Sequence, residues 1–273
     1  MLRYAQVAVP VPLKNEFTYS FDPDVMDVRP GERVIVPFGF VKGKVPRKVQ
    51  GYVIDVLDSV KDEGFEIKPI IRVIDKEPLF DKKDYELALW MEKFYFSSRG
   101  EILDTMIPGG KKDIGFGGLD ADEAIPRPDV VLSDEQENAV RTVMEGKNSL
   151  YYLFGITGSG KTEVFLRCAE KVIEQGGQVI YLVPEITLTH QLALQVMKRF
   201  QNNVAILHSG LTDSQRIAQW RKIKRSEVSL VIGARSAVFA PFSNLKMIII
   251  DEEHENSYKS GNAPRYHARQ VAQ

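Results

Sequence analysis

The spacing of apolar residues divides the chain into two regions of different character. In the first region the apolar residues gather in short runs broken by proline, glycine and aspartate, at positions 5–11, 32–36, 51–57 and 70–74. Runs of this length and spacing predict a small antiparallel sheet or barrel. After Asp81, a candidate N-cap, the period becomes helical as far as residue 95, and we expect four residues of one face in the core: Leu87, Trp90, Met91 and Phe94.

The second region alternates between two kinds of segment. Short apolar or β-branched runs predict strands at 151–154, 178–183, 204–207, 228–232 and 247–250. Stretches with helical periodicity lie between several of these runs, at 162–175, 188–200 and 214–224. Strands that alternate with helices indicate an α/β fold with a mainly parallel sheet.

A glycine-rich segment separates the two regions. Residues 109–128 contain five glycines and two prolines but few apolar side chains, which is typical of a linker. We therefore predict a β-rich domain at 1–108, a flexible linker at 109–128 and an α/β domain at 129–273. The length of 273 residues agrees with two domains of roughly 150 residues each.

Composition narrows the class of protein. Apolar residues make up 44% and charged residues 27%, which excludes a disordered or collagen-like chain. A net charge of −1 argues against coating nucleic acid by bulk charge, although it leaves room for local basic patches. Neither a membrane span nor a secretion signal is evident, and the single Cys168 excludes a disulfide framework and a cysteine-built zinc site in this chain. We expect a cytoplasmic protein without a membrane partner.

The strongest chemical signal is a glycine-rich motif between the first predicted strand and helix of the second region. Residues 155–162 read Gly-Ile-Thr-Gly-Ser-Gly-Lys-Thr, the phosphate-binding pattern G-x-x-x-x-G-K-[ST]. Its glycines let backbone amides face phosphate oxygens, and the next helix points its N-terminus at the same anion. A chance glycine-rich turn would not explain the flanking strand and helix. The motif predicts nucleotide-binding residues at Gly155, Thr157, Gly158, Ser159, Gly160, Lys161 and Thr162, with Lys161 on the β- and γ-phosphates and Thr162 on Mg²⁺.

A second signal is the acidic end of the last predicted strand. Asp251, Glu252, Glu253 and His254 follow three isoleucines, at the sheet edge where a phosphate loop also lies. An isolated acidic cluster of this kind is usually a solvated turn, but the upstream phosphate loop favours a nucleotide site. Asp251 would then hold Mg²⁺ through water, and Glu252 would orient or deprotonate the attacking water.

Each of three polar features in the sequence allows two interpretations. Ser133 and Gln136 fit a helix capping box, but the Gln136 amide also suits the edge of an adenine. Residues 42–48 carry four basic side chains, in either a solvated hairpin or a phosphate-contacting loop. The basic run around Trp220 is either a solvated helix face over a buried tryptophan or a patch for DNA; it comprises Arg216, Arg221, Lys222, Lys224 and Arg225.

The order of the motifs resembles a known group of enzymes. After the phosphate loop come Val-Pro-Glu-Ile at 183–186, Leu-His-Ser-Gly at 207–210, Gly-Ala-Arg-Ser-Ala at 233–237 and Asp-Glu-Glu-His at 251–254, as in superfamily 2 DNA helicases. The resemblance narrows to the primosomal protein N′ family, the PriA-type replication restart helicases. The narrowing residues are Pro-Arg-Tyr-His-Ala-Arg at 264–269, Val-Pro-Val-Pro-Leu at 9–13, Gly-Glu-Arg-Val-Ile-Val-Pro-Phe-Gly at 31–39 and Lys-Pro-Ile at 68–70.

This resemblance implies a function for each region. The first region would capture the nascent 3′ end of DNA at a fork, in a pocket that includes Phe17, Gly39 and Lys68. Thr18 stands where the family has an acid, which puts recognition of the 3′ hydroxyl in doubt. The Phe17 ring would either stack on a base or belong to the core.

The second region would be the first RecA-like lobe of an ATP-dependent motor that uses Mg²⁺. The resemblance assigns adenine reading to Gln136 and contacts with the DNA backbone to Arg235 and Ser236, with Ala234 in place of the usual threonine. It also implies an aromatic-rich loop that couples DNA binding to ATP hydrolysis, with Tyr258, Lys259, Arg265 and Tyr266 as DNA contacts and Arg269 in the same segment.

The family also has parts for which this sequence has no counterpart. These are a second RecA-like lobe with an arginine finger, two cysteine-built zinc sites and a winged-helix domain. The parent activity is 3′-to-5′ DNA unwinding at stalled or repaired forks and promotion of primosome assembly, with single-strand DNA-binding protein and other primosome proteins as partners. We expect poor hydrolysis by this chain alone, because an arginine finger contributes roughly 10³–10⁵ in rate. The alternatives are a non-catalytic fork-binding fragment or degenerate gene product, and a small-molecule kinase.

Overall fold

A computed structural model describes residues 1–273 except 40–45, 62–65, 110–130, 157 and 185–189. The chain forms two compact units. The first contains Met1–Ile114 together with two later segments, Thr212–Arg221 and Lys259–His267, and the second contains the remainder. The predicted linker lies almost wholly outside the described residues, and so do Lys42 and Lys44 of the basic segment 42–48, whereas Arg47 and Lys48 begin a described strand.

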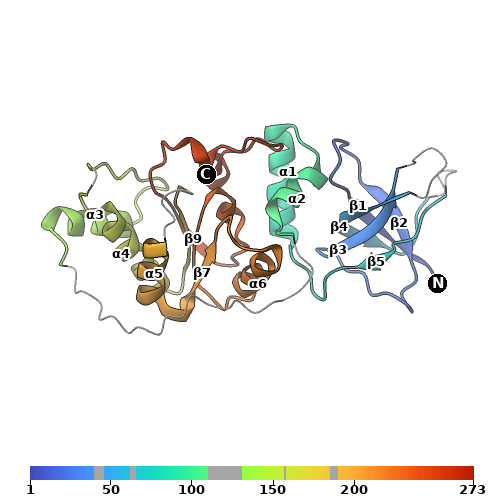
Figure 1. The fold of residues 1–273 in the computed structure, drawn as a ribbon, viewed down its shortest axis with the longest axis horizontal. Helices are drawn as coiled ribbons and strands as arrows, with labels where there is room; N and C mark the ends of the chain where they lie inside the picture. Colours follow the sequence, from blue (N-terminus) through green and yellow to red (C-terminus); the bar gives the residue numbers. More distant parts are fainter. Residues whose placement is uncertain (40–45, 62–65, 110–130, 157, 185–189) are drawn as a thin grey trace. The chain divides into compact units, whose positions relative to one another are not determined.

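The first unit is built on a five-stranded antiparallel sheet (Figure 1). Its spatial order is β2 (Phe17–Phe21), β1 (Arg3–Ala8), β4 (Arg47–Leu57), β3 (Arg33–Phe38) and β5 (Arg72–Val73). The backbone just before β5 returns to β2, because Ser20 N donates to Lys68 O at 3.0 Å and Ile70 N donates to Ser20 O at 2.9 Å. These bonds join the two edges of the sheet, so the predicted small barrel is present and closed.

Alternating side chains fill the barrel. Val7, Val34, Val36 and Val53 are all fully buried in one cluster, as expected for the inward face of strands. Strand β2 was not predicted from the sequence, since Thr18 and Ser20 interrupt its aromatic residues. Strand β4 begins earlier than predicted, at Arg47, because it continues through polar residues.

Two capped helices follow the barrel. Helix α1 (Lys82–Tyr95) begins at Asp81, which forms a capping box with Asp84 as the sequence suggests. Helix α2 (Arg99–Met106) was not predicted; Ser98 caps it, and its Gly100 passes so close to Val9 O that a Cβ would lie 1.9 Å from that oxygen.

The expected core face of α1 is only partly correct. Met91 is buried, but Trp90 and Phe94 are 38% and 48% exposed and stack on each other at 5.0 Å between ring centroids. Helical periodicity identified the face but could not show how far the neighbouring elements cover it.

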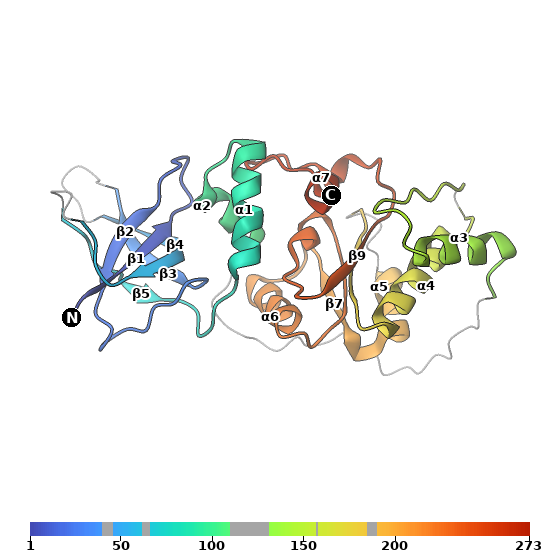
Figure 2. The same ribbon diagram turned by 180° about the vertical axis from the view of Figure 1, so that it is seen from behind.

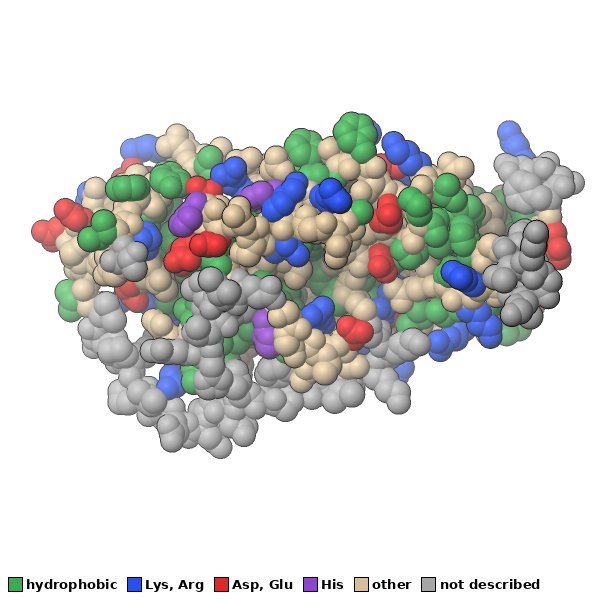
Figure 3. Space-filling view, turned by 45° about the horizontal axis from the view of Figure 1, so that its top comes forward, with side chains coloured by type: hydrophobic (Ala, Val, Ile, Leu, Met, Phe, Trp, Pro, Cys, Tyr) green, Lys and Arg blue, Asp and Glu red, His purple; other side chains and the backbone are tan. Residues whose placement is uncertain are grey.

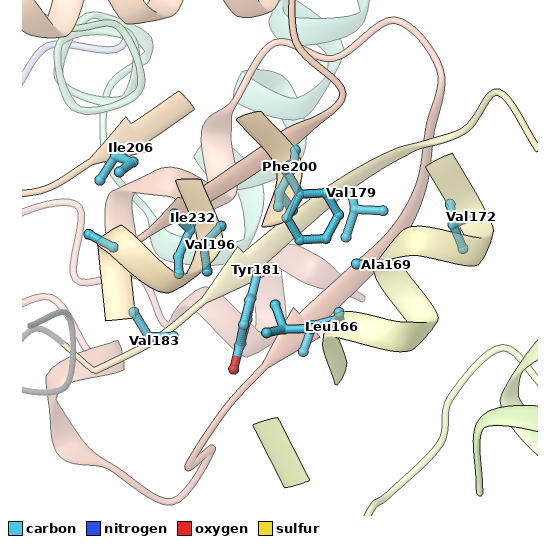
Figure 4. Close-up of a cluster of buried hydrophobic side chains, with 13 residues drawn as sticks. Leu166, Ala169, Val172, Val179, Tyr181, Val183, Val196, Phe200, Ile206 and Ile232 are labelled. Atoms are coloured by element: carbon cyan, nitrogen blue, oxygen red, sulfur yellow. The ribbon is translucent and has the colours of Figure 1, made fainter. Parts of the chain in front are cut away.

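The second unit contains a parallel four-stranded sheet. Its order is β7 (Val204–Leu207), β8 (Leu230–Gly233), β6 (Gln178–Leu182) and β9 (Leu245–Ile250). Helices α4 (Lys161–Glu174) and α5 (His190–Phe200) cover one face of the sheet (Figures 1 and 2). Leu166 and Ala169 of α4 and Val196 of α5 pack there against Val179 and Tyr181 of β6 (Figure 4). The predicted α/β architecture is confirmed.

One predicted strand is not found among the described residues. The apolar run at 151–154 has no assigned secondary structure and belongs to neither sheet. Its side chains alternate: Leu153 packs in a cluster with Val140 and Val164, whereas Tyr152 and Phe154 are 73% and 86% exposed. A strand requires a paired neighbour, which local sequence does not specify.

Helix α6 (Asp213–Lys224) contributes its first part, to Arg221, to the first unit. Trp220 is 2% exposed and its indole donates to Leu79 O at 2.7 Å, which agrees with the prediction of a buried tryptophan. Beside it, Asp75 accepts two hydrogen bonds from the buried Arg33 guanidinium, at 2.7 and 2.9 Å, and Arg221 lies 3.8 Å from the same carboxylate.

Within the described part of the chain, none of the helices is long and apolar enough to cross a membrane. Figure 3 shows basic and acidic side chains interspersed on one face of the molecule, in keeping with the balanced charge.

The buried ion pair yields a stability prediction. Asp75→Ala leaves the Arg33 guanidinium buried without its carboxylate, so we expect the free energy of unfolding of the first unit to fall by about 3–5 kcal/mol. Urea denaturation measures this change. The matched control is Asp58→Ala, because that carboxylate is 87% exposed and pairs with Arg3 at the surface. The control should cost less than about 1 kcal/mol, and an equally small effect of Asp75→Ala would contradict the prediction.

Candidate functional site

The phosphate loop leads directly into the N-terminus of α4. Gly160 is the N-cap residue, with a φ of 78°, and no side chain caps the helix, so its first amides keep their capacity for an anion. The Lys161 ammonium donates to Gly155 O at 2.6 Å and Ile156 O at 3.1 Å, both within the loop. Gly158, Ser159 and Thr162 lie in the same turn, whereas Thr157 is outside the described residues.

Gln136 connects the preceding helix to this loop. Helix α3 (Asp134–Met144) begins with a complete capping box between Ser133 and Gln136, as predicted. The Gln136 amide group also donates to Ser159 O at 3.0 Å, and a Cβ on Gly160 would lie 2.4 Å from that nitrogen. A side-chain amide has two donors and two acceptor lone pairs, so both capping and a contact with a base fit its capacity.

The acidic motif lies at the end of β9, where its first carboxylate is held tightly. Asp251 is 7% exposed; its Oδ2 accepts from the Tyr181 hydroxyl at 2.9 Å and its Oδ1 from Glu252 N at 3.0 Å. Glu252 itself is exposed and has a φ of 46°, a backbone conformation that costs a non-glycine residue roughly 1–3 kcal/mol. A conformation of this cost at a candidate catalytic residue is typical of functional sites.

These residues fit a magnesium ion. The Tyr181 hydroxyl donates to Asp251 at 2.9 Å, and Thr162 is close enough to Tyr181 to influence its pKa, so a carboxylate and a hydroxyl oxygen come to the same part of the site. Mg²⁺ prefers such oxygen ligands and commonly takes few of them from the protein and the rest from water and phosphate. The described residues contain no group of three or more His, Cys, Asp or Glu side chains that would hold a metal alone.

Sequence reasoning missed Tyr181 and Arg199. Burial, and then the neighbouring Asp251 carboxylate, raise the pKa of the Tyr181 phenol well above its usual range, so it remains a donor. Arg199 of α5 binds Glu170 at 2.6 and 2.8 Å and Glu163 at 2.7 Å, which joins α5 to the first turn of α4 beside Thr162. A lone hydroxyl in an apolar strand was the only sequence signal for Tyr181, and Arg199 had none.

The structure places Phe17 and Gly39 near each other and Lys68 against the later part of β2. Phe17 begins β2 and packs edge-on against Phe38 at 5.0 Å between centroids, and Gly39 follows Phe38. Lys68 lies next to Pro69, which bridges to Ser20 of β2. Phe17 is half-buried, so its ring both packs in the barrel and keeps an accessible part.

The remaining candidate DNA contacts fall into exposed and buried groups. Ser236, Lys259 and Arg265 are exposed, and the half-buried Arg235 donates to Ser257 O at 3.0 Å. Tyr258 and Tyr266 are only 1% and 2% exposed, so neither ring offers a face for stacking in this conformation. The Tyr258 hydroxyl instead donates to Asp251 O at 2.6 Å, which ties the loop to the acidic motif.

Two family profiles match the chain and account for both of its regions. Residues 6–108 match the PriA-type "3'DNA-binding domain (3'BD)", and residues 133–272 match the "DEAD/DEAH box helicase" profile. The chain belongs to the DEAD/DEAH box helicase family.

Comparison with individual proteins gives more specific similarities. The chain is 44% identical over 280 aligned residues to the replication restart protein PriA of Treponema pallidum, covering 100% of this chain and 42% of that protein. It is 53% identical over 145 residues to PriA of Bacillus subtilis, covering 52% of this chain and 18% of the relative. It is 29% identical over 349 residues to PriA of Haemophilus influenzae, covering 99% and 47%. The chain thus spans less than half the length of these relatives.

The dual contacts of Gln136 generate a test. Gln136→Glu keeps the side-chain acceptor of the capping box but loses the donor to Ser159 O. We expect helix content by circular dichroism to be unchanged and the affinity for a fluorescent ATP analogue to fall about threefold to tenfold, because one hydrogen bond contributes about 1 kcal/mol. Ser133→Ala is the control, since it removes the cap but keeps the bond to the loop. Equal affinity of wild type and Gln136→Glu would argue against a role in the nucleotide site.

Proposed function

We propose that this chain binds ATP with Mg²⁺ in its second unit, binds DNA with a 3′ end in its first unit, and couples the two in replication restart. The observation that supports the proposal most directly is the convergence of Thr162 and Asp251, from motifs far apart in the sequence, on the Tyr181 hydroxyl. A phosphate loop without an acidic partner would suit any phosphate ligand; the pair suits a metal-bound nucleotide.

Each residue of the nucleotide site would have its own role in binding or hydrolysis. The uncapped amides of α4 and the Lys161 ammonium bind the phosphates. To do so, Lys161 leaves its two carbonyl partners in the loop and donates to phosphate oxygens instead. Thr162 and Asp251 would hold Mg²⁺, which neutralises developing charge on the phosphates when it is bound. Glu252, exposed at the sheet edge, orients and deprotonates the attacking water. Gln136, beside Ser159, keeps one amide hydrogen for adenine.

DNA binding would use residues of both units. On the barrel, Phe17, Gly39 and Lys68 would receive the terminal nucleotide, with Phe17 against the base and Lys68 against a phosphate. Arg235 and Ser236 of the second unit, and Lys259 and Arg265 of the first, would supply donors for the phosphate backbone. The buried Tyr258 and Tyr266 stabilise the loop that carries the exposed Lys259 and Arg265, rather than stacking on bases themselves.

Further functional details rest on the resemblance to the family. We infer that the whole protein unwinds DNA in the 3′-to-5′ direction at stalled or repaired forks and promotes primosome assembly. Its partners would include single-strand DNA-binding protein and other primosome proteins, and it would act in the cytoplasm. Zinc would be held by cysteines in a part of the protein that the present sequence does not include.

ATP hydrolysis separates an enzyme from a non-catalytic fork-binding module. Phosphate release by the purified chain should increase when a 3′-ended fork is added, and Lys161→Ala should abolish this increase because the ammonium no longer reaches the phosphates. Melting temperature serves as the folding control. Lys161-dependent turnover would exclude a pure binding module, whereas fork binding without turnover would favour it. Turnover unaffected by DNA would instead favour a small-molecule kinase.

Recognition of the 3′ end can be tested by restoring the acid of the family. We expect the wild type to bind 3′-hydroxyl and 3′-phosphate ends with affinities within about threefold, because Thr18 lacks a carboxylate to accept from the hydroxyl and repel the phosphate. Thr18→Asp should raise the preference for the hydroxyl end to about tenfold or more, about 1.4 kcal/mol. Fluorescence anisotropy measures both affinities. Lys68→Ala should weaken binding to both ends alike, and an unchanged preference in Thr18→Asp would place the 3′ end elsewhere.

A further inference from the structure

A buried tyrosine of β6 holds one of the two candidate metal ligands and lies near the other. The Tyr181 hydroxyl donates to Asp251 Oδ2 at 2.9 Å. A phenol has a single proton, and here the carboxylate receives it. Burial raises the pKa of this phenol, and Thr162 is close enough to it to lower that pKa in part.

This contact leaves the expected carboxylate ligand prepared for a cation. Each carboxylate oxygen of Asp251 accepts one of two bonds, from Tyr181 and from Glu252 N, and retains further acceptor capacity.

The position of Tyr181 is fixed by its surroundings. Its ring is fully buried among side chains of α4, α5 and the sheet, and it lies 6.0 Å from the Phe165 ring in an edge-on arrangement. The backbone of Tyr181 pairs with Ile232 on one side and Ile249 on the other. Figure 4 shows the hydroxyl directed away from Phe200 and Val179, at the margin of the cluster.

A second tyrosine fixes the same aspartate from the other side. The Tyr258 hydroxyl donates to Asp251 O at 2.6 Å, while Asp251 N donates to Leu182 O at 2.9 Å. The backbone and side chain of Asp251 are therefore both restrained. Tyr258 precedes the exposed Lys259, a candidate phosphate contact, so displacement of this loop would act on Asp251 through a single residue.

We propose that Tyr181 is a positioning residue that holds the Asp251 carboxylate in the orientation that binds a magnesium–nucleotide complex. The inference rests on the proposed nucleotide-binding function and adds a residue to it. Groups that hold metal ligands in place typically contribute about 10–100-fold to metal affinity. Tyr181 touches neither nucleotide nor metal in this scheme, so its removal should weaken binding only when the metal is present.

The test is Tyr181→Phe, which removes one oxygen and keeps the packed ring. Titration with a fluorescent ADP analogue is performed in Mg²⁺ and in excess EDTA. We expect affinity to fall about 10–100-fold in Mg²⁺ and by less than about twofold in EDTA. Higher Mg²⁺ should restore the affinity of the variant.

Tyr52→Phe is the matched control. Tyr52 is also fully buried, and its hydroxyl donates to the carboxylate of Asp104 at 2.7 Å in the first unit. A general effect of losing a buried tyrosine hydroxyl would lower the melting temperature of both variants. Only Tyr181→Phe should change the Mg²⁺ dependence of nucleotide binding.

The outcomes separate the inference from the function on which it rests. No nucleotide binding by the wild type in either condition would overturn the proposed function itself. Wild-type binding in Mg²⁺ combined with unchanged Mg²⁺ dependence in Tyr181→Phe would overturn the positioning role alone. If the variant does not fold, fluorotyrosine-labelled wild type provides a second measurement. A tyrosine fluorine resonance should shift on adding Mg²⁺ to the ADP complex and broaden with Mn²⁺, and no such response would contradict the proposal.

Discussion

The second unit depends on the need to keep a carboxylate buried beside a sheet of apolar strands. Asp251 follows three isoleucines and is almost inaccessible to solvent, so its oxygens require donors from the protein. The Tyr181 hydroxyl and the Glu252 amide donate to the carboxylate, and Tyr258 donates to the backbone carbonyl of the same residue. Because these donors come from β6, from the turn itself and from the segment after β9, satisfying the polar groups of one residue fixes the relative position of several elements.

The hydrogen bonds that hold Asp251 lie beside residues that are more exposed to solvent. Glu252 is exposed and Lys161 is half-buried at the start of α4, whereas Asp251 is held by the hydroxyl of a buried ring. The proposed phosphate-binding part of the site would thus be adaptable, whereas the proposed metal-binding carboxylate is held in place. Arg199 extends the rigid part to α5 through its paired carboxylates on α4, and those carboxylates keep the guanidinium pKa above its usual value despite burial.

Local sequence predicted the features that depend on local chemistry. The helix N-cap at Asp81, the capping box at Ser133 and the barrel strands rich in valine follow from residue types within a few positions of one another. Tyr181 could not be found in this way, because its importance arises from the register that sets it beside Ile249, two residues before Asp251. The sequence analysis placed Phe94 in the core and Phe154 in a strand, and both side chains are exposed. These predictions were wrong for a similar reason, because burial and pairing depend on partners from distant parts of the sequence.

The indole of Trp220 and the carbonyl of Leu79 are 141 residues apart in sequence but belong to one compact unit. The first unit therefore includes residues from two distant parts of the sequence. A ribosome would complete the barrel long before it synthesised Trp220. Until then, the apolar surface around Leu79 that Trp220 covers would remain exposed to water. Expression of the barrel region alone would leave that surface permanently open to water, so its solubility should depend on how the chain is divided.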